Sequence, residues 1–270
     1  MKLKDEVAIV TGSTTGIGVA IAHLAAAEGA KVVVTGRRGS GESVAEDIRK
    51  EGYEAIFVQA DISIEADVRR LVQRAADEFG HPTVLINNAA PTDLVGPGNL
   101  DGRLTDVDTE EFDQILHVGL YGAYWTCYYV IPHMQAAGHG SVVNISSAAG
   151  IKACPRVFAY AVAKGGLQAL TRSVAADYAR DGIRANSVIV GFVVSNPLAE
   201  KFAADEAMSA AMRSTHLTRF GEPLDIAHAA TFLASEEAAF ISGSDLYADG
   251  GCCVMQALPA TKSEARGRNR

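Results

Sequence analysis

Tyr160 and Lys164 stand four residues apart in the segment Tyr160-Ala161-Val162-Ala163-Lys164, at the start of a long helical pattern. In an α-helix this spacing places both side chains on one face of one turn. A tyrosine hydroxyl ordinarily keeps its proton up to a pH of about 10, and a neighbouring ammonium group favours the phenolate and lowers that pKa. Such a phenol can give a proton to a carbonyl oxygen or take one from an alcohol. The spacing alone also fits a solvated helix face, so the surrounding chain must decide between the two.

The composition is that of one large α/β domain. The chain has 270 residues, of which 48% are hydrophobic, enough for a full core. Its formal net charge is −8, and no basic block precedes the C-terminal residues, which argues against a nucleic-acid partner. No apolar run approaches the roughly 18 residues of a membrane helix, and the N-terminus lacks the apolar region of a signal peptide. We therefore expect small-molecule partners.

The cysteine pattern predicts a protein without a metal site. The four cysteines, Cys127, Cys154, Cys252 and Cys253, form no Cys-x-x-Cys pair, and two of them are adjacent. This arrangement indicates neither a zinc site nor a disulfide framework. A reducing, cytoplasmic location is the expectation that follows.

Apolar, β-branched runs alternate with helical patterns along the chain. The expected strands are Val7–Val10, Lys31–Val34, Ala55–Gln59, Val84–Ile86, Ser141–Ile145, Arg184–Val190 and Asp245–Tyr247. The expected helices are Ile17–Glu28, Gly41–Glu51, Glu65–Phe79, Thr109–Ala136 and Ala159–Asp181. This alternation predicts a parallel sheet covered on both faces. We expect a single doubly wound Rossmann-type α/β domain over residues 1–258, with a seven-stranded parallel sheet.

Three segments depart from this alternation. Pro91–Asp108 is rich in glycine and proline and is long for a connection. Ser195–Ser214 is an apolar-rich helical insert, which we expect to cover the substrate. Residues 259–270 are polar and basic, and we expect a disordered tail there.

The segment Thr11–Gly18 follows the first strand and opens a helix. Glycines permit a tight turn and let backbone N–H groups approach a pyrophosphate, while the helix N-terminus adds a favourable dipole. In this context the turn predicts dinucleotide binding rather than a purely structural role. The candidate cofactor contacts are Gly12, Ser13, Thr14, Thr15, Gly16, Ile17 and Gly18.

The second strand ends in Thr35-Gly36-Arg37-Arg38, without the acidic residue that binds the adenosine ribose in NAD proteins. A guanidinium stands there instead and suits a 2′-phosphate. Arg37 and Arg38 therefore predict a preference for NADP(H), with NAD(H) as the alternative cofactor. Both arginines would also fit the solvated start of the next helix.

Taken together, these motifs resemble the short-chain dehydrogenase/reductase family over about residues 5–251. Asp61 and Ile62, in Ala60-Asp61-Ile62, match the family segment that contacts adenine. Asn88, in Asn87-Asn88-Ala89-Ala90, matches the motif after the fourth strand. Val193 and Ser195 lie in Gly191–Ser195, which matches the family's Pro-Gly-x-Ile-x-Thr segment with Val190 in the proline position. The segments Arg219–Pro223 and Asp249–Gly251 match its C-terminal signatures.

The resemblance also implies a set of catalytic residues, of which Tyr160 and Lys164 would also contact the cofactor. Ser147 lies thirteen residues before Tyr160, as the family's catalytic serine does. It implies that Ser147 binds the substrate oxygen and that Tyr160 is the acid or base. Lys164 would hold the nicotinamide ribose and lower the pKa of the tyrosine. Strand alternation should turn the neighbouring Ser146 away from the site.

One position departs from the family pattern. The segment reads His117-Val118-Gly119-Leu120-Tyr121-Gly122, so Gly119 stands where the family has an asparagine of the proton relay. Glycine has no side chain for that task and costs about 1 kcal/mol of helix propensity relative to alanine. Either water fills the gap and the chemistry is retained, or the catalyst is altered.

The leading prediction is an NADP(H)-dependent oxidoreductase for a bulky, apolar ketone or secondary alcohol, such as a steroid, a terpenoid or a cyclic compound. A 3-oxoacyl thioester reductase is the first alternative, although Arg156 is the single candidate cation for an acyl-carrier partner. A non-catalytic cofactor-binding scaffold is the alternative from another class. The resemblance also implies a homotetramer or homodimer, formed through the two long helices.

Overall fold

The computed structural model describes residues 1–95, 99–216 and 218–255. Within these residues seven strands form one sheet in the order β3-β2-β1-β4-β5-β6-β7, and every neighbouring pair is parallel. The predicted Rossmann-type α/β fold is confirmed. The strands are β1 Val7–Val10, β2 Lys31–Gly36, β3 Ala55–Gln59, β4 Val84–Asn87, β5 Gly140–Ser147, β6 Ile183–Val190 and β7 Asp245–Ala248.

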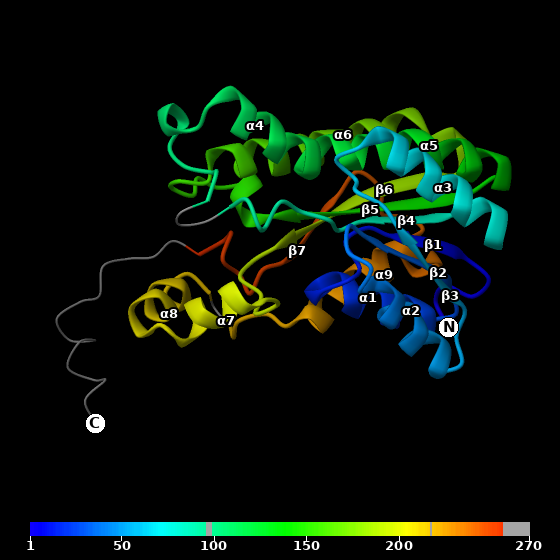
Figure 1. The fold of residues 1–270 in the computed structure, drawn as a ribbon, viewed down its shortest axis with the longest axis horizontal. Coiled ribbons are helices and arrows are strands. Elements are labelled where there is room, and N and C mark those ends of the chain that lie inside the picture. Colours follow the sequence, from blue (N-terminus) through cyan, green and yellow to red (C-terminus); the bar gives the residue numbers. More distant parts are fainter. Residues whose placement is uncertain (96–98, 217, 256–270) are drawn as a thin grey trace.

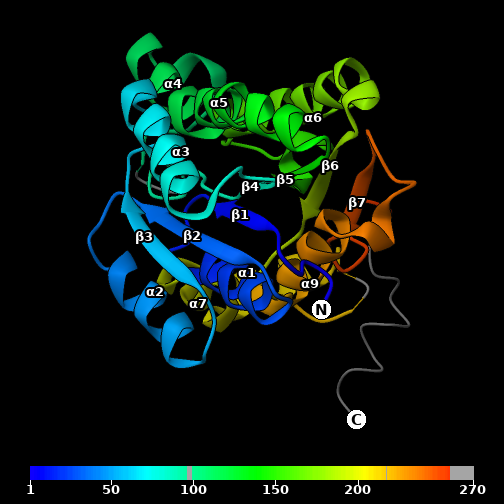
Figure 2. The ribbon, with the colours of Figure 1, turned by 90° about the vertical axis from the view of Figure 1, so that its right-hand side faces the viewer.

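Helices cover both faces of the sheet (Figures 1 and 2). One layer contains α3 Glu65–Phe79, α4 Thr109–Leu116, α5 Gly122–Ala137 and α6 Phe158–Asp177. The other contains α1 Gly16–Ala27, α2 Gly41–Lys50 and α9 Pro223–Ala234. Two clusters of buried side chains, one on each face, pack these helices against the sheet. The strands are therefore apolar on both faces, as is typical of a covered parallel sheet.

Two expectations about helices needed correction. The segment expected to be one helix, Thr109–Ala136, is α4, then a π-helical turn at His117–Tyr121, then α5. The buried Gly119 lies in this turn, and π-turns inside helices frequently mark functional sites. The helix expected over Ala159–Asp181 ends at Asp177 and is followed by a 3₁₀ turn. Helix α9 was absent from the expected elements, because its small residues give little amphipathic contrast.

The predicted insert forms two short helices, α7 Pro197–Ala204 and α8 Glu206–Arg213, which lie beyond one end of the sheet on the side of α1, α2 and α9 (Figures 1 and 2). Asn196 caps α7 by accepting the N–H of Ala199, and Asp205 caps α8 by accepting the N–H of Met208. The tail expected at 259–270 lies outside the described residues. No helix in the described ranges combines the length and apolarity needed to cross a membrane.

A buried series of polar side chains connects the central strands to the helices above them. Thr126 of α5 donates to Asn87 Oδ1 at 2.6 Å, and Asn87 donates to Asn144 Oδ1 at 2.9 Å. Asn144 in turn donates to Thr171 of α6 at 2.8 Å, and the Thr171 and Ser187 hydroxyls are 2.8 Å apart. Because each polar group has a hydrogen-bond partner, the series can be buried at little cost. Its hydrogen bonds fix the position of α6 relative to the sheet.

Candidate active site

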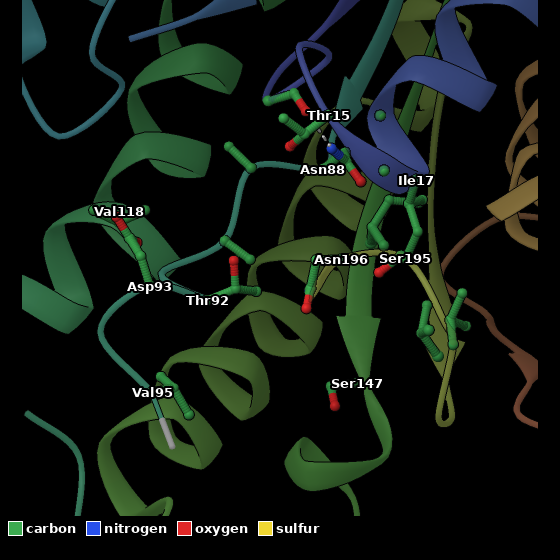
Figure 3. Close-up of a pocket in the computed structure, with 18 of the residues that line it drawn as sticks. Thr15, Ile17, Asn88, Thr92, Asp93, Val95, Val118, Ser147, Ser195 and Asn196 are labelled. Carbon is green, nitrogen blue, oxygen red and sulfur yellow. Dashed lines mark hydrogen bonds between the residues drawn. The ribbon is translucent and has the colours of Figure 1, made fainter. Parts of the chain in front are cut away.

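A cavity of about 500 Å³ opens at the carboxyl ends of the strands, where β1 and β4 lie side by side in the sheet. The chain leaves β1 and β4 toward opposite halves of the sheet, and ligands bind at such a switch point in open α/β sheets. In Figure 3 the connection after β4 carries Thr92, Asp93 and Val95 along one side of the cavity. Ser195 and Asn196 enter it from the segment after β6, and Ser147 stands at the end of β5.

Three glycines shape the turn before α1. Gly12 and Gly16 have φ values of +63° and +54°, which glycine adopts without strain. A Cβ atom on Gly18 would lie 2.2 Å from the carbonyl oxygen of Gly12, and one on Gly16 would lie 2.6 Å from that of Ser195. The turn therefore has room for backbone alone.

The turn fits a diphosphate. Thr15 is the N-cap of α1 and makes no side-chain capping bond, so the first N–H groups of α1 are left to a ligand in the cavity. The predicted residues Gly12, Thr14, Thr15, Gly16, Ile17 and Gly18 all line the cavity.

Ser13 is the exception among the predicted contacts of this turn. Its hydroxyl donates to Val10 O at 2.6 Å and accepts the N–H of Thr35, while its own N–H donates to Thr35 O. The residue is fully buried and is outside the cavity lining. Its groups join β1 to β2, so Ser13 supports the turn from below.

Asn88 supports the same turn from the β4 side. Its side-chain amide donates to the carbonyl oxygens of Thr11 and Gly12 at 2.9 and 3.1 Å, and its backbone N–H donates to the Thr11 hydroxyl. Asn88 also lines the cavity. The residue can therefore both hold the glycine turn and present its remaining amide oxygen to a ligand.

The predicted adenine end of the cavity is lined by Arg37, Arg38, Asp61 and Ile62. Asp61 accepts the backbone N–H and the hydroxyl of Ser63, so its carboxylate is already oriented. Arg37 donates to Asp93 Oδ2 at 2.5 Å, and this bond raises the pKa of the guanidinium. No sequence pattern predicted this ion pair, whose two residues are 56 positions apart.

The predicted catalytic residues meet in the same cavity. Ser147, Tyr160 and Lys164 all line it, with Lys164 Nζ 5.7 Å from the centre of the Tyr160 ring. Lys164 is 2% exposed and donates to the carbonyl oxygen of Ile145 at 2.7 Å. Ser146 is buried and its hydroxyl donates to the carbonyl oxygen of Lys164, but the residue also contributes to the cavity lining, from which it was predicted to be turned away.

The electrostatics of the pair differ from the expectation. Burial raises the pKa of Tyr160, and the hydroxyl of Ser147, which hydrogen-bonds to it, offsets this rise only in part. Burial also lowers the pKa of Lys164 to about 8. The net direction is therefore opposite to the predicted lowering of the Tyr160 pKa. Tyr160 is accordingly set up as a proton donor.

Asp101 is a positioning residue that sequence reasoning missed. It is 7% exposed, and its two carboxylate oxygens accept the N–H groups of Ala159 and Tyr160 at 3.0 and 2.9 Å. Asp101 thus caps the first turn of α6 from a connection 58 residues earlier in the chain. The only signal in the sequence was an acidic residue within the irregular segment Pro91–Asp108.

His216 joins the insert to the cavity wall. Its Nδ1 lies 2.7 Å from the carbonyl oxygen of Met212 in α8, and its Nε2 lies 3.1 Å from the backbone nitrogen of Phe192. A carbonyl can only accept and an N–H can only donate, so the proton of a neutral ring is on Nδ1. Phe192 lines the cavity beside Val193 and Ser195, and Phe220 packs edge-on against both Phe192 and His216.

Comparison with known proteins identifies the family. Residues 12–253 match a family model described as enoyl-(acyl carrier protein) reductase. The chain is 36% identical over 247 residues to the cis-4-hydroxycyclohexanecarboxylate dehydrogenase of Sinomonas cyclohexanicum, covering 92% of this chain and 96% of that protein. The chain belongs to the short-chain dehydrogenase/reductase family. It is thus an oxidoreductase of the class that acts on CH–OH groups.

Other short-chain dehydrogenases/reductases match it over similar lengths. The 7α-hydroxysteroid dehydrogenase of Clostridium sardiniense is 36% identical over 243 residues, or 90% of this chain and 91% of that protein. Among solved structures, a gluconate 5-dehydrogenase from Burkholderia cenocepacia J2315, in complex with NADP and tartrate, superposes with a TM-score of 0.87. That match has 30% identity and covers 94% of this chain and 98% of the other.

Gly119 is where this short-chain dehydrogenase/reductase departs from the family pattern. A Cβ atom at this position would lie 2.9 Å from the Cβ atom of Ala163, the neighbour of Lys164, and 3.6 Å from the ring of Pro91. The space that an asparagine side chain would need is therefore filled by α6. With glycine in place of asparagine, the π-turn at His117–Tyr121 packs closely on α6.

A possible ligand cluster also lies just after β7. Asp249, Cys252 and Cys253 bring a carboxylate and two thiols within 4.8 Å of one another. The carboxylate accepts the N–H groups of Gly251 and Cys253 at 2.9 and 2.8 Å. Burial, together with a smaller effect of this carboxylate, raises the pKa of Cys253 to about 12. Asp249 thereby caps the turn after β7, and we assign no metal to it.

Proposed function

We propose that this protein is an NADP(H)-dependent oxidoreductase that interconverts a bulky, apolar ketone and its secondary alcohol. The observation that carries the proposal is the meeting of Ser147, Tyr160 and Lys164 in one cavity with the glycine turn of α1. A proton donor, an oxyanion partner and a diphosphate site in one cavity are what carbonyl reduction requires. NAD(H) is the second cofactor candidate.

Each of the three residues has a role in this proposal. In reduction, Ser147 donates a hydrogen bond to the carbonyl oxygen, and Tyr160 gives its proton to that oxygen as negative charge develops there. Lys164 stabilises the resulting phenolate through its positive charge and, with Tyr160, holds the nicotinamide ribose. A bound nicotinamide would supply the hydride to the carbonyl carbon in reduction and would accept a hydride from the alcohol carbon in oxidation. In oxidation Tyr160 takes the proton of the alcohol.

The remaining predicted contacts divide along the cavity. Gly12, Thr14, Thr15, Gly16, Ile17 and Gly18 would bind the diphosphate, and Asp61 and Ile62 the adenine. Arg37 and Arg38 would bind the 2′-phosphate of NADP(H), with Asn88, Val193 and Ser195 nearer the nicotinamide. All of these residues line the cavity, which supports the assignment. The bound NADP of the gluconate 5-dehydrogenase structure supports the choice of cofactor.

The lining favours an apolar substrate. Val95, Phe192, Leu198 and Phe202 contribute apolar side chains to the cavity, two of them from α7 of the insert. Two relatives carry ring compounds in their names, a hydroxycyclohexanecarboxylate and a hydroxysteroid. We therefore propose a cyclic or steroid-like alcohol or ketone, covered by the insert at 195–214.

We also propose a homodimer or homotetramer in the cytoplasm. Tyr124 and Tyr128 on α5 and Val162 on α6 are 45%, 58% and 46% exposed, and a second copy could bury them. The four free cysteines are consistent with a reducing compartment. Light scattering of the purified protein would measure the assembly, and a monomer would contradict this part of the proposal.

The test is a panel of cyclic ketones, steroid ketones and a 3-oxoacyl thioester, each assayed with NADPH and NADH. We expect turnover of a cyclic or steroid ketone, and Tyr160→Phe should lower kcat about 10²–10⁴-fold with nearly unchanged cofactor affinity. Preferred turnover of the thioester would favour the 3-oxoacyl reductase alternative. Binding of NADPH without any turnover would favour the scaffold and overturn the proposal.

A further inference from the structure

The ion pair between Arg37 and Asp93 lies inside the proposed cofactor cavity. The guanidinium and the carboxylate both line that cavity, and the bond between Nη2 and Oδ2 is 2.5 Å long. Arg37 directly follows β2, at the position that reads the adenosine ribose in dinucleotide-binding folds. Asp93 reaches it from the connection after β4, so the carboxylate missing from the end of β2 is supplied by another segment.

The local charges leave little net attraction for a phosphate. Arg37 and Arg38 contribute two positive charges, while Asp61 and Asp93 contribute two negative charges to the same end of the cavity. Asp61 also acts on Arg37 electrostatically, in addition to the direct bond from Asp93. A phosphate monoester carries nearly two negative charges at neutral pH, so it must compete with Asp93 for Arg37 and also approach that carboxylate.

The pair is weak enough to exchange. Both side chains are about half exposed, 49% for Arg37 and 48% for Asp93, and exposed ion pairs are screened by water and salt. The Asp93 carboxylate is held beside Arg37 by the ion pair itself, because neither side chain is buried. A 2′-phosphate can therefore displace the carboxylate, at a cost in affinity.

We propose that Asp93 is a specificity-determining residue that competes with the 2′-phosphate of NADP(H) for Arg37 and so narrows the preference of this enzyme for NADP(H) over NAD(H). The inference rests on the proposed function, because it assumes that the cavity binds the cofactor. Under this proposal the preference between NADP(H) and NAD(H) depends on the contact between Arg37 after β2 and Asp93 after β4, and not on the end of β2 alone.

The test is direct binding of two cofactor fragments, adenosine 2′,5′-bisphosphate and 5′-AMP, to the full-length protein by calorimetry. Asp93→Asn keeps the shape of the side chain and removes its charge. We expect it to tighten adenosine 2′,5′-bisphosphate about tenfold at low salt and to leave 5′-AMP within about twofold. The gain should shrink as salt is raised, because the charges are exposed.

Two further variants make the test specific. Asp106→Asn removes the same charge from the same connection, at an exposed residue that is not paired with Arg37, and should change neither affinity. In an Arg37→Ala background, Asp93→Asn should lose most of its effect. Thermal unfolding of each variant checks that the fold is retained.

Three results would count against the inference. Unchanged or weaker binding of adenosine 2′,5′-bisphosphate by Asp93→Asn would overturn it, as would an equal gain in the Arg37→Ala background. Weaker binding of 5′-AMP would show that Asp93 binds the ribose directly and would also overturn it. If the wild-type protein bound neither fragment, the proposed function itself would fail, and the inference with it.

Discussion

Lys164 donates a hydrogen bond from Nζ to the carbonyl oxygen of Ile145, the residue two positions before Ser147 on β5. The bond holds the ammonium group at the end of the strand and 5.7 Å from the ring of Tyr160. Since the lysine is buried, its pKa falls to about 8. Lys164 therefore loses the positive charge that the proposed mechanism needs as the pH rises through about 8.

The pKa shifts predict a single alkaline limb for ketone reduction. Below pH 8 Lys164 is charged, and Tyr160, whose pKa is raised, keeps its proton well beyond that pH. Both groups are in the required state, so kcat/KM should be level there and fall as pH rises through about 8. The measurement is kcat/KM for one active ketone between pH 6 and 10. Lys164→Arg should move the limb upward, because a guanidinium stays charged; a limb that stays in place would assign it to another group.

Gly119→Asn should not improve the enzyme. A Cβ atom at 119 already meets Ala163 at 2.9 Å, so the larger side chain overpacks the contact between the π-turn and α6. We expect a loss of about 1–3 kcal/mol of unfolding free energy and no gain in kcat. Adding Ala163→Gly should recover part of the stability by making room. A tenfold rise in kcat for Gly119→Asn alone, with an unchanged unfolding temperature, would show instead that the proton relay is broken in the natural sequence.

Asp101→Ala should lower both stability and kcat. It removes the acceptors for the N–H groups of Ala159 and Tyr160 and frees the first turn of α6, with a loss of about 0.5–2 kcal/mol. Asp108→Ala is the matched control, since Asp108 caps α4 through the N–H of Glu111 and makes no hydrogen bond to α6. Denaturant unfolding and steady-state kinetics should show similar stability losses but a fall in kcat for Asp101→Ala only. Equal kcat values would reduce Asp101 to a structural cap.

His216→Leu should weaken substrate binding more than catalysis. The change removes the bonds to Met212 O and to the N–H of Phe192, each worth about 1 kcal/mol, and releases α8 from the cavity wall. We expect KM for an apolar ketone to rise several-fold, with faster proteolysis of the segment around α7 and α8. His216→Gln can still offer an oxygen to the N–H of Phe192 and should recover part of the affinity. Unchanged KM in His216→Leu would show that the insert does not depend on this attachment.

The sheet and the catalytic pair followed from local patterns. Apolar β-branched runs that alternate with helical patterns marked the strands, and the spacing of Tyr160 and Lys164 placed both on one turn of α6. The glycines between Thr11 and Gly18 predicted the turn, and the structure shows that a Cβ atom on Gly18 would clash with Gly12 O. These features depend on residues near one another in the chain.

Long-range pairing was beyond such patterns. The bonds of Arg37 with Asp93, of Asp101 with Tyr160 and of His216 with Phe192 each join segments whose approach depends on the whole fold. The raised pKa of Tyr160 was missed for the same reason, since burial is a tertiary property. The π-turn at His117–Tyr121 likewise places Gly119 against Ala163 of another helix, a contact that no local pattern indicates.

The buried hydrogen bonds from Thr126 through Asn87 and Asn144 to Thr171 also bear on how the enzyme could be redesigned. They connect α5, β4, β5 and α6 to one another and involve no residue of the insert at 195–214. Exchange of that insert for the corresponding segment of a relative should therefore leave the position of α6 on the sheet unchanged, together with Tyr160 and Lys164. Under the proposed function, in which this insert covers the substrate, substrate range is separable from acid–base chemistry, and chimaeras are a practical way to change the alcohols that the protein accepts.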